Sequence, residues 1–302
     1  MAFDVVIVSF RSAALLRRCL ASLRAHPPLV PMSVHVVDND SRDGTASMVE
    51  REFPEVALTR AGRNLGFAAA TNLAIVHTAG EFVLVLNPDT EVTDGALDRL
   101  LAVMSARSEV GICGPYLERP DGGFDHAARR SFPTPLSALG HFTGIGRRLD
   151  RGVLAAYRAP DVRAGPVDAV NGACMLIRRD ALARVGLFDE GYWMYMEDLD
   201  LCFRFAEAGW VTWYEPQATV IHLKAGTSGP IRGPRLNYAF HYGMFRFYRK
   251  HYAPRRSALT NGVVYAGIAG KLILSTARAA LRALVRRARE GPRLGSRGGA
   301  AQ

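Results

Sequence analysis

The stretch that decides the fold is residues 3–45, FDVVIVSFRSAALLRRCLASLRAHPPLVPMSVHVVDNDSRDGT. It opens with a β-branched run at residues 3–10 and continues at 13–24 with apolar residues at helical spacing. A second β-branched run at residues 34–37 ends in the polar cluster DNDSRDGT, which is typical of a turn before a helix. A strand, a helix and another strand in this order indicate a parallel βαβ unit.

The same alternation continues along the chain. Strand-like runs follow at residues 56–59 and 81–86, and helical spacing at 67–78 and 94–105. The centre of 81–86 is wholly apolar, as parallel strands covered on both faces usually are. We therefore predict an α/β fold, a doubly wound and mostly parallel sheet flanked by helices, with ligands beyond the carboxyl ends of the strands.

The later part of the chain gives a less regular pattern. Residues 116–163 are rich in Pro, Gly and Arg and predict loops with short elements. Further elements are expected as strands at residues 167–178, 211–214 and 218–221, and as helices at 180–185 and 199–208.

Composition narrows the classes of function. The 302 residues are 49% hydrophobic and 22% charged, which is ordinary for a globular protein and excludes wholesale disorder. Residues 246–302 hold 13 basic residues and only the acidic Glu290, whereas the first 245 residues hold 25 basic and 27 acidic ones. A nucleic-acid binder more often carries its positive charge on the folded body, so we expect no nucleic-acid partner.

The cysteines and the N-terminus favour a cytoplasmic protein. The four cysteines are Cys19, Cys113, Cys174 and Cys202. Their spacing matches neither a CxxC motif nor a zinc site, which fits a reducing compartment. The N-terminal MAFDVVIVSF lacks the basic region and cleavage site of a signal peptide, and its apolar run is too short to span a bilayer.

Two polar motifs follow predicted strands. In VVDNDSRDGT, residues 36–45, Asp38 ends a strand, where its carboxylate can accept hydrogen bonds from a nucleotide base or ribose. An Asx-rich turn that caps the next helix is the alternative for this motif. In LVLNPDTEV, residues 84–92, Asp89 is a hard oxygen ligand suited to Mg²⁺ or Mn²⁺ beside substrate phosphates, although NPD also suits a type I turn.

The most informative segment is FDEGYWMYMEDLDLCFR, residues 188–204. Glu197 and Asp198 fall at the predicted start of a helix, where the helix dipole favours negative charge and keeps a general base ionised. Asp200 and Arg204 have the i, i+4 spacing of a structural ion pair. A solvated helix start with acids that match the dipole is the alternative, and the surrounding aromatic residues argue against it.

A fourth motif, VIHLKAGTSG at residues 220–229, places His222 between a predicted strand and a Gly-rich loop. This histidine is either a ligand for a metal or diphosphate, or a structural residue. Motifs of several other enzyme classes are absent: GxGxxG after the first strand, GxxxxGK followed by Ser or Thr, and GxSxG. A dinucleotide enzyme, a P-loop protein and an α/β-hydrolase are therefore disfavoured.

Taken in order over residues 3–252, the motifs resemble the family 2 glycosyltransferases with the GT-A fold. The resemblance rests on VVIVSFRSAALLRRCLASL, VVDNDSRDGT, NLGFAAATN, LNPDTEV and NGACMLIRRDALARVGLFDEGYWMYMEDLDLCFRFAEAGW. Within the family, the NPD, EDLDLCxR and FYRKHY segments are most similar to rhamnosyltransferase-like members.

The resemblance implies a nucleoside diphosphate sugar that lies across the strand ends. The residues expected to meet this donor are Ser9, Asp38, Asp40, Asn64, Gly66, Phe67 and Asn87. Mg²⁺ or Mn²⁺ would be held by Asp89, with His222 as a further ligand. The family's usual DxD reads Asn-Pro-Asp here, so Asp89 would be the main protein carboxylate on the metal.

The resemblance also implies how the reaction proceeds. Asp198 would accept the proton of an acceptor hydroxyl, which attacks the anomeric carbon in one displacement and inverts its configuration. Glu197 would hold the acceptor or orient Asp198. Trp193 and Tyr195 would either stack on a sugar face or pack in the core.

The sequence is compatible with more than one donor sugar, and two other classes of protein are alternatives to a glycosyltransferase. The rhamnosyltransferase likeness favours dTDP-L-rhamnose as donor and a hydroxyl of a glycan or polyprenyl-linked glycan as acceptor, in cell-surface polysaccharide synthesis. A UDP-hexose or UDP-N-acetylhexosamine donor is the alternative within the family. A sugar-phosphate nucleotidyltransferase would need a Gly-rich basic loop after the first strand, and SFRSAALLRR has no Gly. A non-catalytic scaffold would not need the acids at Asp89, Glu197 and Asp198.

The resemblance divides the chain into a GT-A domain at residues 1–252 and a basic tail at 253–302. Residues 1–115 would form the nucleotide-sugar half of the domain, and 116–252 the acceptor half. The last ~12 residues of the tail, rich in Gly and Arg, are expected to be disordered.

The tail has the pattern of a membrane-surface helix. Residues 261–277 are moderately apolar but interrupted by Lys271 and small residues, so they fall short of a membrane span. In the helical pattern that follows, four arginines form one stripe and apolar residues form the opposite stripe. The arginines are Arg278, Arg282, Arg286 and Arg289. We expect this helix to bind an anionic membrane surface, as a peripheral attachment on the cytoplasmic face, with a surface helix packed on the body as the alternative.

Overall fold

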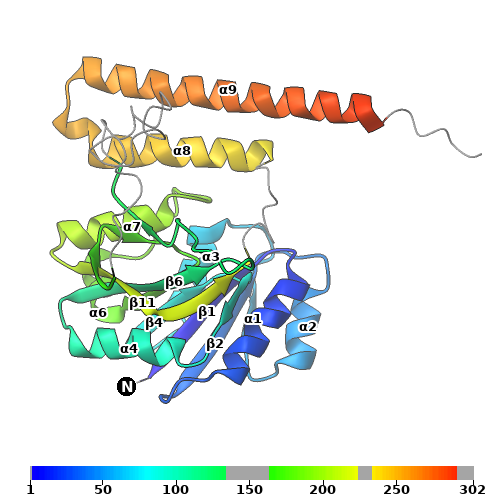
Figure 1. Ribbon diagram of the computed structural model, residues 1–302, viewed down its shortest axis with the longest axis vertical. Coiled ribbons are helices and arrows are strands. Elements are labelled where there is room, and N and C mark those ends of the chain that lie inside the picture. The colour runs from blue at the N-terminus through cyan, green and yellow to red at the C-terminus, as the bar shows by residue number, and fades with distance from the viewer. Residues whose placement is uncertain (1, 134–162, 224–232, 291–302) are drawn as a thin grey trace, which may run out of the picture.

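A computed structural model describes residues 2–133, 163–223 and 233–290 of the chain. Within these ranges the chain forms a nine-stranded mixed sheet with helices on both faces, and a separate pair of strands (Figure 1). The strand order is β3-β2-β1-β4-β10-β6-β11-β5, and β8 pairs with β11.

The first half of the chain alternates strands and helices as the sequence predicted. Its elements are β1 (Phe3–Ser9), α1 (Ala13–Ala25), β2 (Met32–Asp38), α2 (Thr45–Glu52), β3 (Ala57–Arg60), α3 (Phe67–Ile75), β4 (Phe82–Leu86), β5 (Thr90–Val92) and α4 (Ala96–Ala106). β1 pairs in parallel with β2 and β4, and β2 pairs in parallel with β3. These pairings confirm the doubly wound, mostly parallel sheet.

The second half completes the same sheet. Its elements are β6 (Val110–Glu118), β7 (Arg129–Arg130), β8 (Gly165–Val167), β9 (Ala169–Val170), β10 (Cys174–Arg178), α6 (Arg179–Val185), α7 (Glu197–Glu207), β11 (Val211–His222), α8 (Pro234–His251), a 3-10 turn (Ala253–Arg255) and α9 (Ala258–Glu290). β10 runs antiparallel to its neighbours β4 and β6, whereas β6 and β11 are parallel.

Three predictions for this half are wrong in detail. Residues 167–178 form three short strands instead of one, because a turn at 171–173 separates β9 from β10. The two strands predicted at 211–214 and 218–221 are one strand, β11, whose pairing with β6 shifts between Glu215 and Thr219.

The third difference is β6, whose end overlaps the segment predicted as loops and whose start was not predicted. Its glycines are typical of loops, but here close packing requires them. A Cβ at Gly111 would lie 2.7 Å from the Phe205 ring of α7, and one at Gly114 would lie 2.6 Å from Val170 of β9. The missing side chains allow α7 and β9 to pack directly on the sheet.

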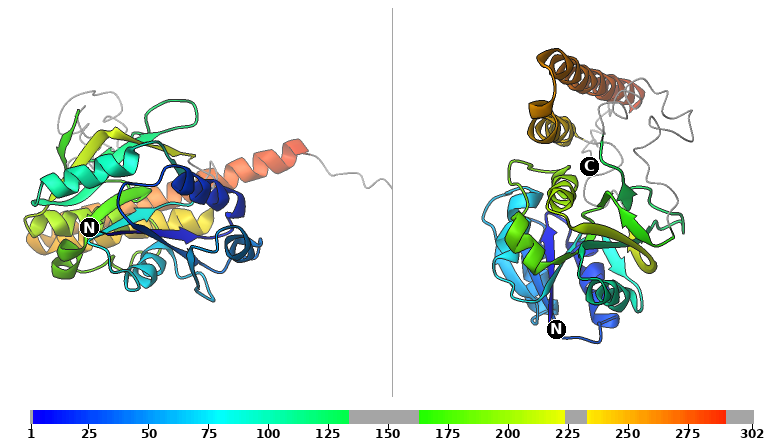
Figure 2. Two further views of the ribbon diagram at one scale, coloured as in Figure 1. Left: turned by 90° about the horizontal axis from the view of Figure 1, so that it is seen from below. Right: turned by 90° about the vertical axis from the view of Figure 1, so that its left-hand side faces the viewer.

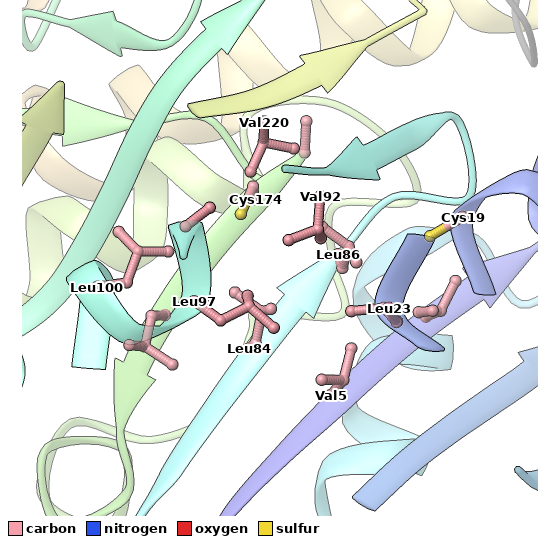
Figure 3. Packing of buried hydrophobic residues seen from close by; sticks show 14 of the residues in the cluster. Val5, Cys19, Leu23, Leu84, Leu86, Val92, Leu97, Leu100, Cys174 and Val220 are labelled. Carbon is pink, nitrogen blue, oxygen red and sulfur yellow. The ribbon is translucent and has the colours of Figure 1, made fainter. Parts of the chain in front are cut away.

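The core consists of one apolar layer on each face of the sheet. Alternate residues of β1 point to opposite layers: Val5 and Ile7 to one, Val6 and Val8 to the other. Figure 3 shows the first layer, in which Leu23 of α1 and Leu97 and Leu100 of α4 pack near Val5, Leu84 and Leu86. α3, α6 and α7 cover the second layer. All four cysteines are buried and free.

Helices α8 and α9 lie side by side beyond this second layer, with α9 on the far side of α8 from the sheet (Figures 1 and 2). Phe247 of α8 belongs to the core, and Phe203 of α7 packs edge-on against it with ring centroids 5.5 Å apart. α8 and α9 are joined by hydrogen bonds from Tyr248 to Asn261 and from Asn237 to Ser275.

Helix α9 is longer than the sequence predicted, because it begins at Ala258 and continues to Glu290. By length and composition alone Ala258–Arg282 would be able to cross a membrane, with mean hydropathy 1.3 and 6% of the apolar stretch buried. This stretch extends beyond residues 261–277 and is long enough for a span by that criterion, and the peripheral attachment stays a prediction. The side chains of Arg286 and Arg289, and the last twelve residues predicted to be disordered, lie outside the described part of the chain.

Candidate active site

The carboxyl ends of β1 and β2 bring Ser9 and Asp38 together. The two residues pair in the parallel register, and the Ser9 carbonyl accepts a hydrogen bond from Asn39 N–H at 2.8 Å. The Ser9 hydroxyl lies 2.7 Å from that of Ser12, and Asp38 Oδ1 accepts the backbone N–H of Ser41 at 3.2 Å. Asp40 follows with a φ of 69°. Ser9 and Asp38 are buried and Asp40 is partly exposed, so the three form a polar corner at this edge.

The loop before α3 lies beside this corner, and Asn39, which the sequence analysis did not single out, holds it. Asn39 accepts the N–H of Leu65 through Oδ1 at 2.8 Å and donates from Nδ2 to the carbonyl of Gly66 at 3.0 Å. Asn64 accepts the N–H of Gly66 at 3.0 Å. The predicted residues Asn64 and Gly66 are therefore next to Asp38, and both shape this loop.

Gly66 also allows the loop before α3 to contact the segment of residues 188–204. Its φ is 85°, and a Cβ there would collide with the carbonyl oxygen of Trp193. The same carbonyl accepts the N–H of Phe67 at 2.8 Å. Gly66, Phe67 and Trp193 are thus brought together, a contact that the sequence did not predict, and glycine is required because of both the φ and the close approach.

The NPD loop after β4 places Asp89 next to His222 at the end of β11. Asp89 is 4% exposed, and its Oδ1 has no hydrogen-bond partner in the described ranges. His222 Nε2 lies 3.6 Å from that oxygen, and His222 Nδ1 lies 3.1 Å from Asp125 Oδ2. Burial lowers the pKa of His222, but the neighbouring carboxylates of Asp125 and Asp89 outweigh it and raise the pKa to about 9.

This corner offers two protein groups to a divalent cation, whose remaining ligands would be water or substrate phosphates. Within residues 2–133, 163–223 and 233–290, no group of three or more His, Cys, Asp or Glu side chains is arranged to hold a metal ion. A buried carboxylate oxygen without a hydrogen-bond partner, beside an imidazole nitrogen, does match the ligands that such ions take. Mg²⁺ commonly completes its shell with substrate phosphates and water, so two protein ligands are compatible with this chemistry.

Glu197 and Asp198 open α7 at a strained turn. Tyr195 and Met196, which precede them, have φ values of 71° and 73°, a region that costs non-glycine residues about 1–3 kcal/mol each. Such strain persists only where the surroundings hold it, and it clusters at functional sites. Gly243 of α8 packs against this turn, since a Cβ there would lie 3.0 Å from the Tyr195 carbonyl oxygen.

The two acids have different surroundings. Asp198 Oδ2 accepts hydrogen bonds from Arg130 at 2.6 Å and from Gly172 N–H at 2.9 Å, and its Oδ1 accepts Leu199 N–H at 2.7 Å. Glu197 is 6% exposed, and its Oε2 has no partner among the described residues. Burial and the charge of Asp198 raise the pKa of Glu197 to about 8.

A single turn connects the acids to the NPD loop. Gly172 donates its N–H to Asp198, and Ala173 accepts the N–H of Asn87 through its carbonyl at 2.9 Å. Asn171 closes the turn by accepting Ala173 N–H at 2.8 Å. The loop of Asp89 and the start of α7 thus both contact the NGA turn.

The aromatic residues of the segment divide between the two predicted roles. Tyr195 packs edge-on against Phe240 of α8, with ring centroids 5.9 Å apart, as expected for a packing residue. Trp193 is half-buried, its Nε1 lacks a partner among the described residues, and the guanidinium of Arg235 lies 4.0 Å from its ring.

Asp200 confirms the predicted ion pair and extends it. Arg204 Nε donates to its Oδ2 at 2.8 Å, and Lys250 and His251 of α8 donate to its Oδ1, each at 2.8 Å. Burial alone would raise the pKa of Asp200, but these donors hold it well below its usual range. The FYRKHY segment, left without a role by the sequence, therefore fixes α8 to α7.

Comparisons with known proteins follow the same motifs. The family described as Glycosyl transferase family 2 matches residues 4–186. The chain belongs to this family. N-acetylglucosaminyl-diphospho-decaprenol L-rhamnosyltransferase of Mycobacterium tuberculosis is 37% identical over 252 residues, which cover 79% of this chain and 80% of the relative. Pre-mycofactocin glycosyltransferase of the same organism is 31% identical, over 72% of this chain and 42% of its own length.

Solved structures share the fold. GalNAc-T7, solved with UDP, GalNAc and Mn²⁺, aligns with a TM-score of 0.60 and 17% identity, over 82% of this chain and 48% of that one. A mannosyltransferase from Pyrobaculum calidifontis, solved with GDP-Man and Mn²⁺, aligns with a TM-score of 0.56 and 18% identity, over 94% and 79%. The fold is therefore GT-A, and the protein is a glycosyltransferase rather than a nucleotidyltransferase.

Proposed function

We propose that this glycosyltransferase transfers a sugar from a nucleoside diphosphate sugar to a hydroxyl of a polyprenyl-linked glycan, with inversion at the anomeric carbon. The observation that carries the proposal is the position of the two acidic groups. The loop with the buried, unpartnered Asp89 oxygen and the Glu197–Asp198 pair both contact the 171–173 turn. A diphosphate at the first and an acceptor hydroxyl at the second would bracket an anomeric carbon.

The donor would lie across the carboxyl ends of the strands. Ser9, Asp38 and Asp40 would contact its base and ribose, and the loop of Asn64, Gly66 and Phe67 would close over them, with Asn87 near the sugar. In open α/β sheets this edge is the usual place for a nucleotide. The polar corner and the tethered loop support this orientation.

Asp89 and His222 would hold Mg²⁺ or Mn²⁺ against the diphosphate. Such an ion neutralises the negative charge that develops on the leaving nucleotide. For this role His222 must present a neutral nitrogen to the ion, and Asp89 must keep its free oxygen. Among the described residues, none forms a hydrogen bond with Asp89 Oδ1, which supports the assignment.

Asp198 would act as the general base. Arg130 and two backbone N–H groups fix its orientation, so it stays in place as the acceptor approaches. Glu197 would hold the acceptor through its unpartnered oxygen, and Trp193 would stack on a sugar ring. Glu197 also competes for the role of base, because a pKa of about 8 suits proton transfer near neutral pH.

The donor is best assigned as dTDP-L-rhamnose, and the acceptor as a glycan on a polyprenyl diphosphate. The L-rhamnosyl group and the polyprenyl diphosphate acceptor follow the name of the rhamnosyltransferase relative, whose identity to this chain is 37%, and dTDP as the carrier is what the family resemblance implies. UDP-hexoses and UDP-N-acetylhexosamines are the alternative donors. The pathway would be the synthesis of a cell-surface polysaccharide.

Helix α9 would attach the enzyme to the cytoplasmic face of the membrane as a unit separate from the catalytic domain of residues 1–252. Its surface exposes seven large apolar side chains: Leu259, Val263, Ile273, Leu274, Leu281, Leu284 and Val285. Arg278 and Arg282 are exposed on the same helix. Apolar and cationic side chains together are what an anionic bilayer surface binds. A membrane-bound enzyme would also meet a polyprenyl-linked acceptor directly.

The deciding experiment is a nucleotide-sugar panel. We expect dTDP-L-rhamnose with Mn²⁺ to raise the unfolding temperature of the purified chain, and to be consumed when a polyprenyl diphosphate N-acetylglucosamine acceptor is added. Stabilisation and turnover by a UDP-sugar would instead establish the alternative donor. If no nucleotide sugar bound or reacted, the proposed function would be wrong.

A further inference from the structure

Asp125 lies in the bend after β6, within the segment that the sequence predicted as loops, and its carboxylate is fixed at both oxygens. Asp125 is 1% exposed. Its Oδ1 accepts the N–H of Ala127 at 3.0 Å, and its Oδ2 lies 3.1 Å from His222 Nδ1. Its own N–H donates to the carbonyl of Leu117 at 2.9 Å, which ties the bend to β6.

The contact with Asp125 determines which nitrogen of His222 is available. A carboxylate can only accept hydrogen bonds, so the imidazole nitrogen facing it carries the proton. In the neutral imidazole the other nitrogen, Nε2, then has a free lone pair. Nε2 is the nitrogen that lies 3.6 Å from Asp89 Oδ1, the buried oxygen without a partner among the described residues.

We propose that Asp125 is a positioning residue that keeps the proton of His222 on Nδ1 and directs Nε2 toward a divalent cation beside Asp89. The proposal rests on the proposed function, because it takes Asp89 and His222 as the ligands. Carboxylates that accept from a ligating histidine in this way fix its orientation and tautomer, and their loss typically weakens metal binding about 10–100-fold.

The geometry makes Asp125→Asn a specific test. The N–H of Ala127 requires an acceptor at the position of Oδ1, so the amide oxygen of the new side chain stays there. The amide NH₂ then faces His222, and a donor opposite Nδ1 moves the imidazole proton to Nε2. That nitrogen can no longer bind a cation, although the size and shape of the side chain are unchanged.

The experiment measures Mn²⁺ binding to the purified full-length chain, with the metal alone as the probe, from the loss of the free-ion electron paramagnetic resonance signal. We expect Asp125→Asn to weaken binding about 10–100-fold, and Asp89→Ala and His222→Gln to weaken it as well. Asp121→Asn is the matched control, because this acid of the same bend is exposed and paired with Arg119. It should bind Mn²⁺ as the wild type does.

A double variant separates positioning from stability. If Asp125 acts through His222, Asp125→Asn should add little to the loss already caused by His222→Gln. Full additivity, or wild-type Mn²⁺ affinity in a folded Asp125→Asn chain, would overturn the proposal. Wild-type affinity in Asp89→Ala and His222→Gln would instead overturn the metal site of the proposed function. Should Asp125→Asn fail to fold, Asp125→Ser, whose hydroxyl is too short to reach Nδ1, must give the same weakening.

Discussion

The connection between α7 and α8 is tested most sharply at His251. Its Nε2 lies 2.8 Å from Asp200 Oδ1, and the two side chains are 4% and 0% exposed. Leu is similar in size to His, so His251→Leu still fills the space beside Phe203 and Phe247. It removes one hydrogen-bond donor from the buried carboxylate of Asp200. The ring contacts of His251 with Phe203 and Phe247, at centroid distances of 4.3 and 4.8 Å, are lost too, so the hydrogen bond is isolated by comparison with a second ringless variant that keeps a donor.

The magnitude follows from what remains at Asp200. Arg204 and Lys250 still donate to its carboxylate, so it stays ionised and paired. The loss is then one hydrogen bond to a charged group, about 1.5–3 kcal/mol, instead of the larger cost of an unpaired buried charge. For a chain of 302 residues about 2 kcal/mol corresponds to a decrease of roughly 3 °C in the unfolding temperature.

The assay is thermal and urea unfolding of the purified protein, followed by circular dichroism. His251→Gln is the matched variant, because its amide can still donate to Asp200, and it should lose less than half as much stability. An unfolding temperature of His251→Leu equal to that of the wild type would refute the assignment of Asp200 as the junction of the two helices.

Three further predictions concern pH and membrane binding. Glu197→Gln should raise the unfolding temperature relative to the wild type, and by more at pH 8 than at pH 5. Folding raises the pKa of the Glu197 carboxyl to about 8, so the wild-type protein loses stability as pH increases from the unfolded pKa of this group. Equal differences in unfolding temperature at both pH values would contradict this. The Lys250 side chain is 33% exposed, and Lys250→Met should lower the free energy of unfolding by about 1 kcal/mol at pH 7. The matched change at its exposed neighbour, Arg249→Met, should not change that free energy measurably. Because the buried partner carboxylate of Lys250 keeps a pKa well below its usual range in the folded state, the cost should persist as pH falls through about 4 and close only well below that value, and a gap already closed at pH 4 would be inconsistent. Replacing Arg278 and Arg282 with Ser should reduce flotation with phosphatidylglycerol vesicles, and unchanged flotation would exclude an electrostatic role for α9.

The first half of the fold could be predicted because its signals are local. The centre of residues 81–86 is wholly apolar, and the strand-like runs alternate with stretches of about a dozen residues at helical spacing. β6 could not be predicted in this way, because Gly111 and Gly114 are selected by the close approach of Phe205 and Val170, which are distant in sequence. Periodicity within one segment carries no information on such contacts.

The same distinction between local and distant signals applies to the residues of the candidate site. Asp38, Asp89 and Glu197 were recognisable because each stands next to a strand end or helix start that the sequence itself reveals. Arg130 and Asp125 were missed, since their importance comes from partners 68 and 97 residues away. The ion pair of Asp200 with Arg204 was predicted from i, i+4 spacing, whereas its partners on α8 follow only from the packing of two helices.

The central claim is that Asp198 removes the proton of the acceptor hydroxyl in a site whose donor half is built independently. The most direct measurement compares sugar transfer and Mn²⁺-dependent donor binding for Asp198→Asn and the wild type, on the same preparations. Loss of a general base predicts a decrease in transfer of about 10²–10⁴-fold, while donor affinity stays close to that of the wild type. Transfer near the wild-type rate, or a loss of donor binding as large as the loss of transfer, would contradict the account.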